Sequence, residues 1–272
     1  MKANLFMCNG KDFERAAELI WECWLNGTFL DQLPIKLRPK TRAEGYKIQS
    51  YLEKFSGRPL FGWKIAATSL SGQNHIGVSG PLAGRIFKER VFSPDTTLKF
   101  GANKMAVAEP EFAFKIGKSL SPKLTPYRES EVLALIDSLH PAIELPNSRF
   151  NNFAVVGEEQ LIADNACAHE FVIGPPMGDS WRDLNLAKHK VTISTLNGGV
   201  SEGAGSNVMD GPILALTWLV NELSRHNLTL MEGSIIATGT CAPPLPIKPG
   251  DNITADYGNL GSMQVNLAYN NL

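Results

Sequence analysis

The chain has 272 residues, of which 43% are hydrophobic and 19% charged; this is enough apolar material for a large core and excludes wholesale disorder. Its 26 basic and 27 acidic residues give a net charge of −1, and the absence of a basic run argues against a nucleic-acid-binding protein. No apolar run reaches the roughly 18 residues of a membrane span, and the run within residues 1–8 is too short for a signal peptide, so we expect a cytoplasmic protein.

The N-terminal part predicts two helices. Asp12 can cap a helix that ends at Gly27, because its apolar residues recur at helical spacing along one face. Thr41 and Glu44 form a T-x-x-E capping box, which predicts a second helix that Gly57 ends. We therefore expect residues 1–60 to form a helical N-terminal segment.

From about residue 60 onward, short β-prone runs alternate with Gly and Pro, which predicts a β-rich catalytic body over residues 61–272. Ser130 can cap a helix over 131–139, and Asp210 can cap another with Pro212 in its first turn. Because strands and helices do not alternate regularly, the fold class is α+β. The predicted strands are 61–66, 105–116, 141–146, 170–174, 190–196, 234–238, 252–257 and 262–268.

The strongest local signal is the segment A-E-P-E-F-A-F at 108–114. Residues two apart on a strand face the same side, so Glu109 and Glu111 would present two carboxylates together in apolar surroundings. A hard divalent cation would compensate that cost, and all-oxygen ligation suits Mg²⁺ or Mn²⁺. The alternative is a solvated edge strand with two surface acids.

A third acid, Glu144, lies within the apolar segment H-P-A-I-E-L-P at 140–146. A glutamate on such a run is rarely buried without a partner. Glu144 is therefore either a third metal ligand or one half of a buried ion pair with an arginine such as Arg149.

Lys64 interrupts the apolar strand F-G-W-K-I-A-A at 61–67. A half-buried lysine can orient an anionic substrate or stabilise an enolate, whereas the alternative is a lysine that extends to the surface. The glycine-rich segment 77–84, which includes Leu82 and Gly84, could offer backbone amides to a carboxylate, although a structural turn is its default reading. Segment 257–262 predicts a hairpin turn, and neither glycine-rich segment has a nucleotide-binding pattern.

The polar cluster A-D-N-A-C-A-H at 163–169 precedes a predicted strand. Cys167 and His169 suggest a thiol nucleophile only weakly at this spacing, so we interpret Asn165 and Cys167 as part of a pocket wall. The four cysteines are scattered without C-x-x-C spacing, which argues against a zinc site or a disulfide framework.

Seven collinear segments together resemble the hydratase/decarboxylase branch of the fumarylacetoacetate hydrolase superfamily. They are GWKIAATS at 62–69, GVSGPLAG at 77–84, AEPEFAF at 108–114, PAIELPNSRF at 141–150, ADNACAHEFVIG at 163–174, LALTWLVNEL at 214–223 and PIKPGDNITADYGNLGSMQVNL at 246–267. The resemblance implies a β-rich mixed roll with a metal in its mouth, held by Glu109, Glu111 and Glu144, with Lys64 as the active-site lysine. It also implies a homo-oligomer that acts on a small 2-oxo acid in aromatic catabolism.

The chain departs from the family pattern at three places. Leu82 stands where hydratases of the family carry an acid and where decarboxylase relatives carry an apolar residue. Asn147 replaces an aspartate of the family pattern. Cys167, Ala168 and His169 replace a run of small residues. These departures indicate an intact metal site in an altered substrate pocket.

The resemblance favours a metal-dependent hydratase of a 2-hydroxy-dienoate or 2-oxo-enoate such as 2-oxopent-4-enoate. A 4-oxalocrotonate-type decarboxylase, a C–C hydrolase and a non-catalytic relative that binds a 2-oxo acid remain alternatives. If the protein is a hydratase, another group must replace the missing loop acid. His169 is the candidate from sequence, because imidazole suits general acid–base chemistry near neutral pH.

Overall fold

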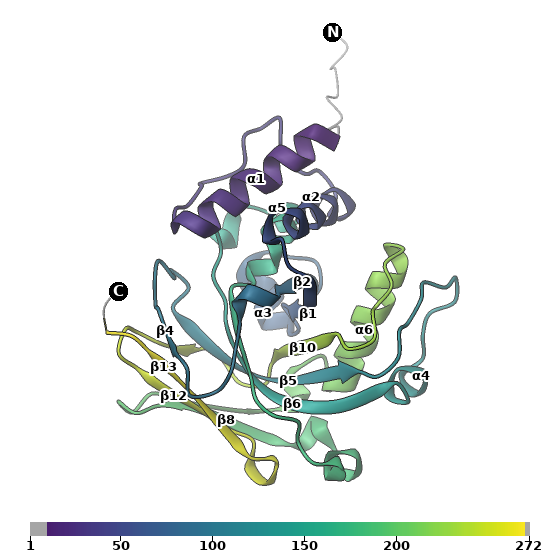
Figure 1. Ribbon diagram of the computed structural model, residues 1–272, viewed down its shortest axis with the longest axis vertical. Helices are drawn as coiled ribbons and strands as arrows, with labels where there is room; N and C mark the ends of the chain where they lie inside the picture. Colours follow the sequence, from purple (N-terminus) through teal and green to yellow (C-terminus); the bar gives the residue numbers. More distant parts are fainter. Residues whose placement is uncertain (1–9, 270–272) are drawn as a thin grey trace.

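The computed structural model describes residues 10–269, so residues 1–8, which entered the argument about a signal peptide, lie outside it. Two curled sheets form the body of the molecule (Figure 1). One is eight-stranded, in the order β2-β1-β10-β5-β6-β7-β3 with β11 paired to β5, and the other is five-stranded, in the order β4-β13-β12-β8-β9. Both sheets mix parallel and antiparallel pairs. The predicted α+β class with a β-rich mixed roll is confirmed.

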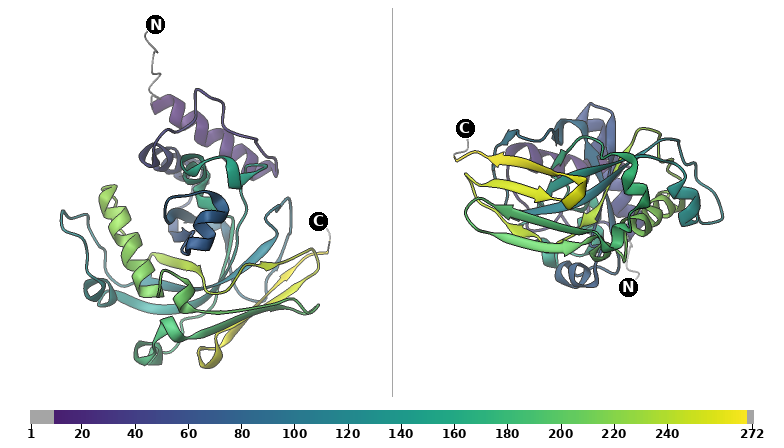
Figure 2. Two further views of the ribbon diagram at one scale, coloured as in Figure 1. Left: turned by 180° about the vertical axis from the view of Figure 1, so that it is seen from behind. Right: turned by 90° about the horizontal axis from the view of Figure 1, so that it is seen from below.

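Eight strands follow the predicted sequence runs, and five further strands were not predicted. Their bounds are β1 Leu60–Ala66, β2 Leu82–Phe87, β3 Val91–Phe92, β4 Thr97–Leu98, β5 Val107–Ile116, β6 Ile136–Leu145, β7 Glu170–Ile173, β8 Lys190–Thr195, β9 Val200–Ala204, β10 Ile235–Thr240, β11 Leu245–Pro246, β12 Asn252–Asp256 and β13 Ser262–Leu267. Figure 2 shows, from below, the five-stranded sheet lying across the base of the molecule.

A helical layer lies above the sheets (Figure 1). It contains α1 (Gly10–Asn26), α2 (Arg42–Ser56) and α5 (Glu158–Ala163), the last contributed by the middle of the chain. Thr41 caps α2 as predicted, because its side chain accepts a hydrogen bond from Glu44 N at 3.2 Å. The return bond of the box differs, since the Glu44 carboxylate accepts from Lys40 N at 2.6 Å rather than from Thr41 N. Gly57 ends α2 with a φ of 64°, a left-handed conformation that glycine adopts without strain.

The helix predicted over 131–139 is wrong in its second half. The helix α4 covers only Glu129–Leu133, and β6 begins at Ile136. Throughout its length β6 pairs with β5, and Leu139 and Ile143 are fully buried. A long ladder with a buried face outweighs local helix propensity, which is a weak determinant of structure. The helix predicted near residue 210 forms as α6 (Pro212–Arg225), with Gly211 rather than Asp210 at its N-cap.

One short helix near the site was not predicted. The helix α3 (Leu70–Ile76) follows β1 directly, and Ser69 caps its N-terminus. Within the described residues, no helix is both long enough and apolar enough to span a membrane.

Candidate metal centre and active-site pocket

Three carboxylates meet on adjacent strands of the larger sheet. Glu109 on β5 lies opposite Glu144 on β6 in the antiparallel register. Glu111 lies two residues further along β5 and therefore faces the same side. One ligand atom from each of the three residues lies within 4.8 Å of the others. The predicted alternative of two surface acids is wrong, because Glu111 is fully buried and Glu109 is half-buried.

Two oxygens of this cluster face no donor. Glu111 accepts a hydrogen bond from Gly239 N through Oε2 at 2.9 Å, and Glu144 pairs with Lys64 Nζ through Oε1 at 3.0 Å. The other oxygens, Glu111 Oε1 and Glu144 Oε2, are buried without a hydrogen-bond partner among the described residues. Such atoms are costly unless something binds them. An all-oxygen, acidic donor set fits a hard divalent cation such as Mg²⁺.

Lys64 is held against the cluster by a strained turn. Its side chain is only 3% exposed, and Nζ donates to Ala166 O at 3.1 Å in addition to pairing with Glu144. Asn165, Ala166 and Cys167 have φ values of 57°, 50° and 61°, a left-handed run that is costly for residues other than glycine. This turn directs the carbonyl group of Ala166 toward the ammonium group of Lys64.

Asn165 fixes the turn to the neighbouring strand β2. Its Oδ1 accepts from Arg85 N at 2.6 Å, and its Nδ2 donates to Arg85 O at 2.8 Å. Gly84, which pairs with Lys64 in the register, leaves room for this arrangement. A Cβ at residue 84 would lie 2.5 Å from Asn165 O and 3.0 Å from Lys64 Cδ.

Burial and mutual repulsion shift the acids toward their protonated forms. Loss of solvation, with the neighbouring Glu144 charge, raises the pKa of Glu109 to about 7. The same two causes raise the pKa of Glu111 well above its usual value. Burial by itself would lower the pKa of Lys64, but the attraction of Glu144, Glu109 and Glu111 outweighs it, and the pKa is raised. Lys64 therefore stays cationic beside the acids.

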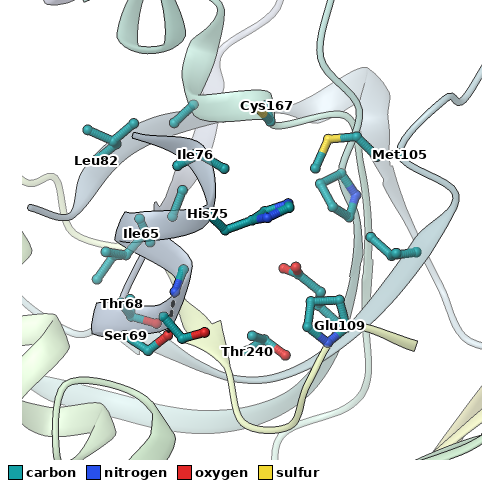
Figure 3. Close-up of a pocket in the computed structure, with 18 of the residues that line it drawn as sticks. Ile65, Thr68, Ser69, His75, Ile76, Leu82, Met105, Glu109, Cys167 and Thr240 are labelled. Carbon is teal, nitrogen blue, oxygen red and sulfur yellow. Dashed lines mark hydrogen bonds between the residues drawn. The ribbon is translucent and has the colours of Figure 1, made fainter. Parts of the chain in front are cut away.

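A cavity of about 550 Å³ opens beside Lys64 and Glu109 (Figure 3). Its walls come from β1, α3, the start of β5, the turn at 165–167 and the segment after β10, and they are mostly apolar with some hydroxyl groups. Its lining residues include Ile65, Thr68, Ser69, His75, Ile76, Leu82, Met105, Glu109, Cys167 and Thr240.

The four residues expected to bind substrate divide into two pairs. Leu82 and Cys167 line the cavity. Gly84 and Asn165 do not line it. Gly84 leaves room for the Lys64 side chain, and Asn165 fixes the turn whose Ala166 carbonyl accepts from Lys64. The expectation that segment 77–84 is a loop is wrong at its end, because Leu82 and Gly84 belong to strand β2.

His169 lies elsewhere, and the structure contradicts its predicted role. It lines a separate cavity of about 590 Å³, together with Trp24, Arg90 and Glu170. Its Nδ1 accepts a hydrogen bond from Trp24 Nε1 at 2.8 Å. Burial, with repulsion from Arg90 and Arg149, lowers its pKa to about 3. Because His169 precedes β7 and faces this other cavity rather than the acid cluster, it is not placed for proton transfer at the acids.

Two other sequence alternatives are resolved by the packing. Arg149, expected as a possible partner of Glu144, instead pairs with Asp164 at 2.5 Å and is 2% exposed. Burial raises the pKa of Cys167 to about 12, so its thiol stays protonated and is not a nucleophile.

Sequence reasoning missed two residues of the site. His75 lines the cavity from α3, and the Ser69 cap is the sequence signal that could have identified this helix. Tyr257, predicted only as part of a hairpin turn, is fully buried beneath the acids. Its hydroxyl donates to Ala142 O at 2.6 Å and accepts from Glu111 N at 3.1 Å. It thereby ties the two ligand-bearing strands together.

The curled sheets and the acid cluster define the class of protein. The model of the fumarylacetoacetate (FAA) hydrolase C-terminal family matches residues 80–268, and the chain belongs to this family. Among its relatives, a 2-keto-4-pentenoate hydratase from Paraburkholderia xenovorans (strain LB400) is 28% identical over 263 residues, which cover 95% of this chain and 96% of the relative. A 4-oxalocrotonate decarboxylase from Pseudomonas sp. is 25% identical over 255 residues, covering 92% and 95%.

Among solved structures, the 4-oxalocrotonate decarboxylase from Pseudomonas putida G7, complexed with magnesium and adipate, superposes with a TM-score of 0.87. The match covers 96% of this chain and 99% of that chain at 24% sequence identity. This likeness extends the shared fold to the helical N-terminal part of the chain, outside the residues that the family model matches.

Proposed function

We propose that the protein is a metal-dependent hydratase that adds water to a small 2-hydroxy-2,4-dienoate or its 2-oxo-enoate tautomer. The observation that carries the proposal is the carboxylate cluster at the cavity, with its two partnerless oxygens and the buried Lys64. The hydratase relatives, which align over almost the whole chain, support this reaction class.

Glu109, Glu111 and Glu144 would hold Mg²⁺ or Mn²⁺. When bound, the cation supplies Lewis-acid stabilisation of negative charge on the substrate oxygens. Lys64 provides a second, fixed positive charge, because its ammonium group is held by Glu144 and Ala166 O before any substrate arrives. A preorganised charge in a site with little water stabilises a developing anion without the cost of reorganisation.

The cavity lining favours a monocarboxylate. Lys64 is the only lysine or arginine among the described residues that line it, and the remaining walls are mostly apolar or hydroxyl-bearing. A second carboxylate on the substrate would therefore find no cation on the far wall. An unpaired buried charge is costly, so we expect the cavity to bind a monocarboxylate in preference to a dicarboxylate.

A decarboxylase of a 2-oxo diacid is the second candidate, and Leu82 is the observation that favours it. Leu82 is fully buried in the cavity wall, where it cannot activate water. Decarboxylation requires no activated water, so that reaction tolerates an apolar residue at this position. The decarboxylase relative and the neighbouring structure agree with this candidate.

The experiment is a comparison of two substrates with the purified protein and Mg²⁺. Hydration of 2-hydroxypenta-2,4-dienoate without CO₂ release from 4-oxalocrotonate supports the hydratase. The reverse pattern replaces it with the decarboxylase. Cleavage of an acylpyruvate identifies a C–C hydrolase, and binding of 2-oxo acids without turnover of any substrate identifies a non-catalytic relative.

We further propose a homo-oligomer that works in the cytoplasm, as the family resemblance implies. Light scattering coupled to size-exclusion chromatography tests the assembly, and a monomer peak contradicts it. Activity titrations with each ion alone test whether Mn²⁺ replaces Mg²⁺.

A further inference from the structure

The cavity contains few groups that can exchange a proton with water. Its titratable lining residues among the described part of the chain are Lys64, His75, Glu109 and Cys167. Lys64 is engaged by Glu144, and Glu109 belongs to the acid cluster. Cys167 keeps its proton, because burial raises its pKa to about 12. By elimination, His75 is the group available for water chemistry.

The geometry of His75 agrees with this role. Its imidazole points into the cavity from α3, across from the carboxylate of Glu109 (Figure 3). Within residues 10–269 the structure records no hydrogen bond of the His75 side chain. The imidazole ring lies against the ring of Phe153, with 6.1 Å between the two centroids. All five histidines of the chain lie within the described residues, and only His75 lines this cavity.

The short helix α3 is fixed at both ends, which determines where residue 75 projects. The Ser69 side chain accepts from Gly72 N at 3.1 Å, and Gln73 Nε2 donates to Ala67 O at 3.0 Å. Gly77 closes the helix with a φ of 65°, and its amide donates to Gln73 O. The imidazole is thus placed by local hydrogen bonds rather than by the acid cluster.

We propose that His75 is the catalytic acid–base residue that replaces the missing loop acid, an assignment that rests on the proposed hydratase function. As the water oxygen bonds to C4 of the 2-oxo-3-enoate, one water O–H bond breaks and His75 accepts that proton. The electron pair of the C3–C4 double bond moves toward C2 and forms an enolate. The imidazolium then returns the proton to C3, so one water has been added and the imidazole is neutral again.

The test compares His75→Gln and His75→Ala with Asn74→Ala in the Mg²⁺-loaded protein. Asn74 is the adjacent residue on α3, is exposed and does not line the cavity, so it controls for damage to the helix. Hydration of 2-hydroxypenta-2,4-dienoate is followed from pH 5.5 to 9. We expect kcat to fall about 10²-fold or more in both His75 variants with KM within about twofold, as for loss of a general acid–base.

Three further readouts separate proton transfer from a structural effect. One limb of the pH–rate profile should disappear in His75→Gln. Added imidazole should restore part of kcat in His75→Ala but not change Asn74→Ala. Mg²⁺ affinity by calorimetry should stay the same in all variants, because His75 is outside the acid cluster.

If the wild-type protein hydrates the dienoate and His75→Ala keeps full activity, the assignment of His75 is wrong while the proposed hydratase function stands. A fall in kcat that is equal in Asn74→Ala overturns the assignment as well. If the wild-type protein does not hydrate the dienoate, the proposed function fails and this assignment fails with it.

Discussion

Glu109 and Glu144 occupy directly opposed positions of the antiparallel β5–β6 ladder. Like charges at such positions destabilise a sheet, and burial adds to the cost. The arrangement is compensated in part by Lys64, whose ammonium group lies 3.0 Å from Glu144 Oε1. One buried cation cannot balance three ionised acids, so this strand pairing favours either protonation of the acids or the binding of a further positive charge. The following predictions test how the charge is balanced.

Glu111→Gln should remove divalent-cation binding while keeping the shape of the side chain. We expect Mg²⁺ to bind the wild-type protein in calorimetry and to raise its Tm, since a ligand that binds only the folded state stabilises it. The variant should show neither effect. Glu202→Gln, at an exposed acid on β9, is the control and should bind as the wild type does. Equal binding by Glu111→Gln would show that the cluster is not the site.

Lys64→Met should lower kcat/KM by about 10² or more, as for the loss of one preorganised charge. It should also lower the free energy of unfolding of the metal-free protein by about 3 kcal/mol, because Glu144 is left as an uncompensated buried acid. Adding Glu144→Gln to this variant should restore much of the stability and none of the activity. A single variant with full activity would contradict the role of Lys64.

Asn165→Ala should impair the site without touching the cavity. It removes both hydrogen bonds to Arg85, so we expect about 1–3 kcal/mol lower stability in chemical denaturation. The turn that presents Ala166 O to Lys64 should loosen, and kcat/KM should fall. Asn227→Ala provides the control, because Asn227 is an exposed left-handed residue with a φ of 56°. If both variants lose stability and kcat/KM equally, the cause is the left-handed backbone conformation rather than the hydrogen bonds to Arg85.

His169→Gln should leave turnover close to that of the wild type but change the acid sensitivity of the fold. The pKa of His169 is about 3 in the folded protein and about 6.5 in the unfolded chain. Between these values the unfolded state binds more protons, so His169 makes stability fall as pH drops below 6.5. Unfolding free energies measured from pH 7 to 4 should therefore decline less steeply in the variant. Parallel curves, or a large loss of turnover, would contradict this reading.

Local patterns in the sequence were sufficient for eight of the strands, for the helices α1, α2 and α6, and for the pair of acids on β5. The two-residue spacing of Glu109 and Glu111 places both on one face of any strand, whatever its partners. The limits of α2 are set locally, by the Thr41 side chain that accepts from Glu44 N at one end and by the left-handed conformation of Gly57 at the other. These local patterns predict the structure correctly because the interactions behind them involve only residues that are close in the chain.

Contacts between distant segments were decided only by the tertiary structure. The partner of Glu144 is Lys64 rather than the nearby Arg149, because β1 and the 165–167 turn converge on the acids while Arg149 is held by Asp164. The tertiary structure also separates the two histidines, since His75 lines the cavity and His169 faces a different one. Strand register and the packing of helices against sheets determine these neighbours, and neither is encoded in local periodicity.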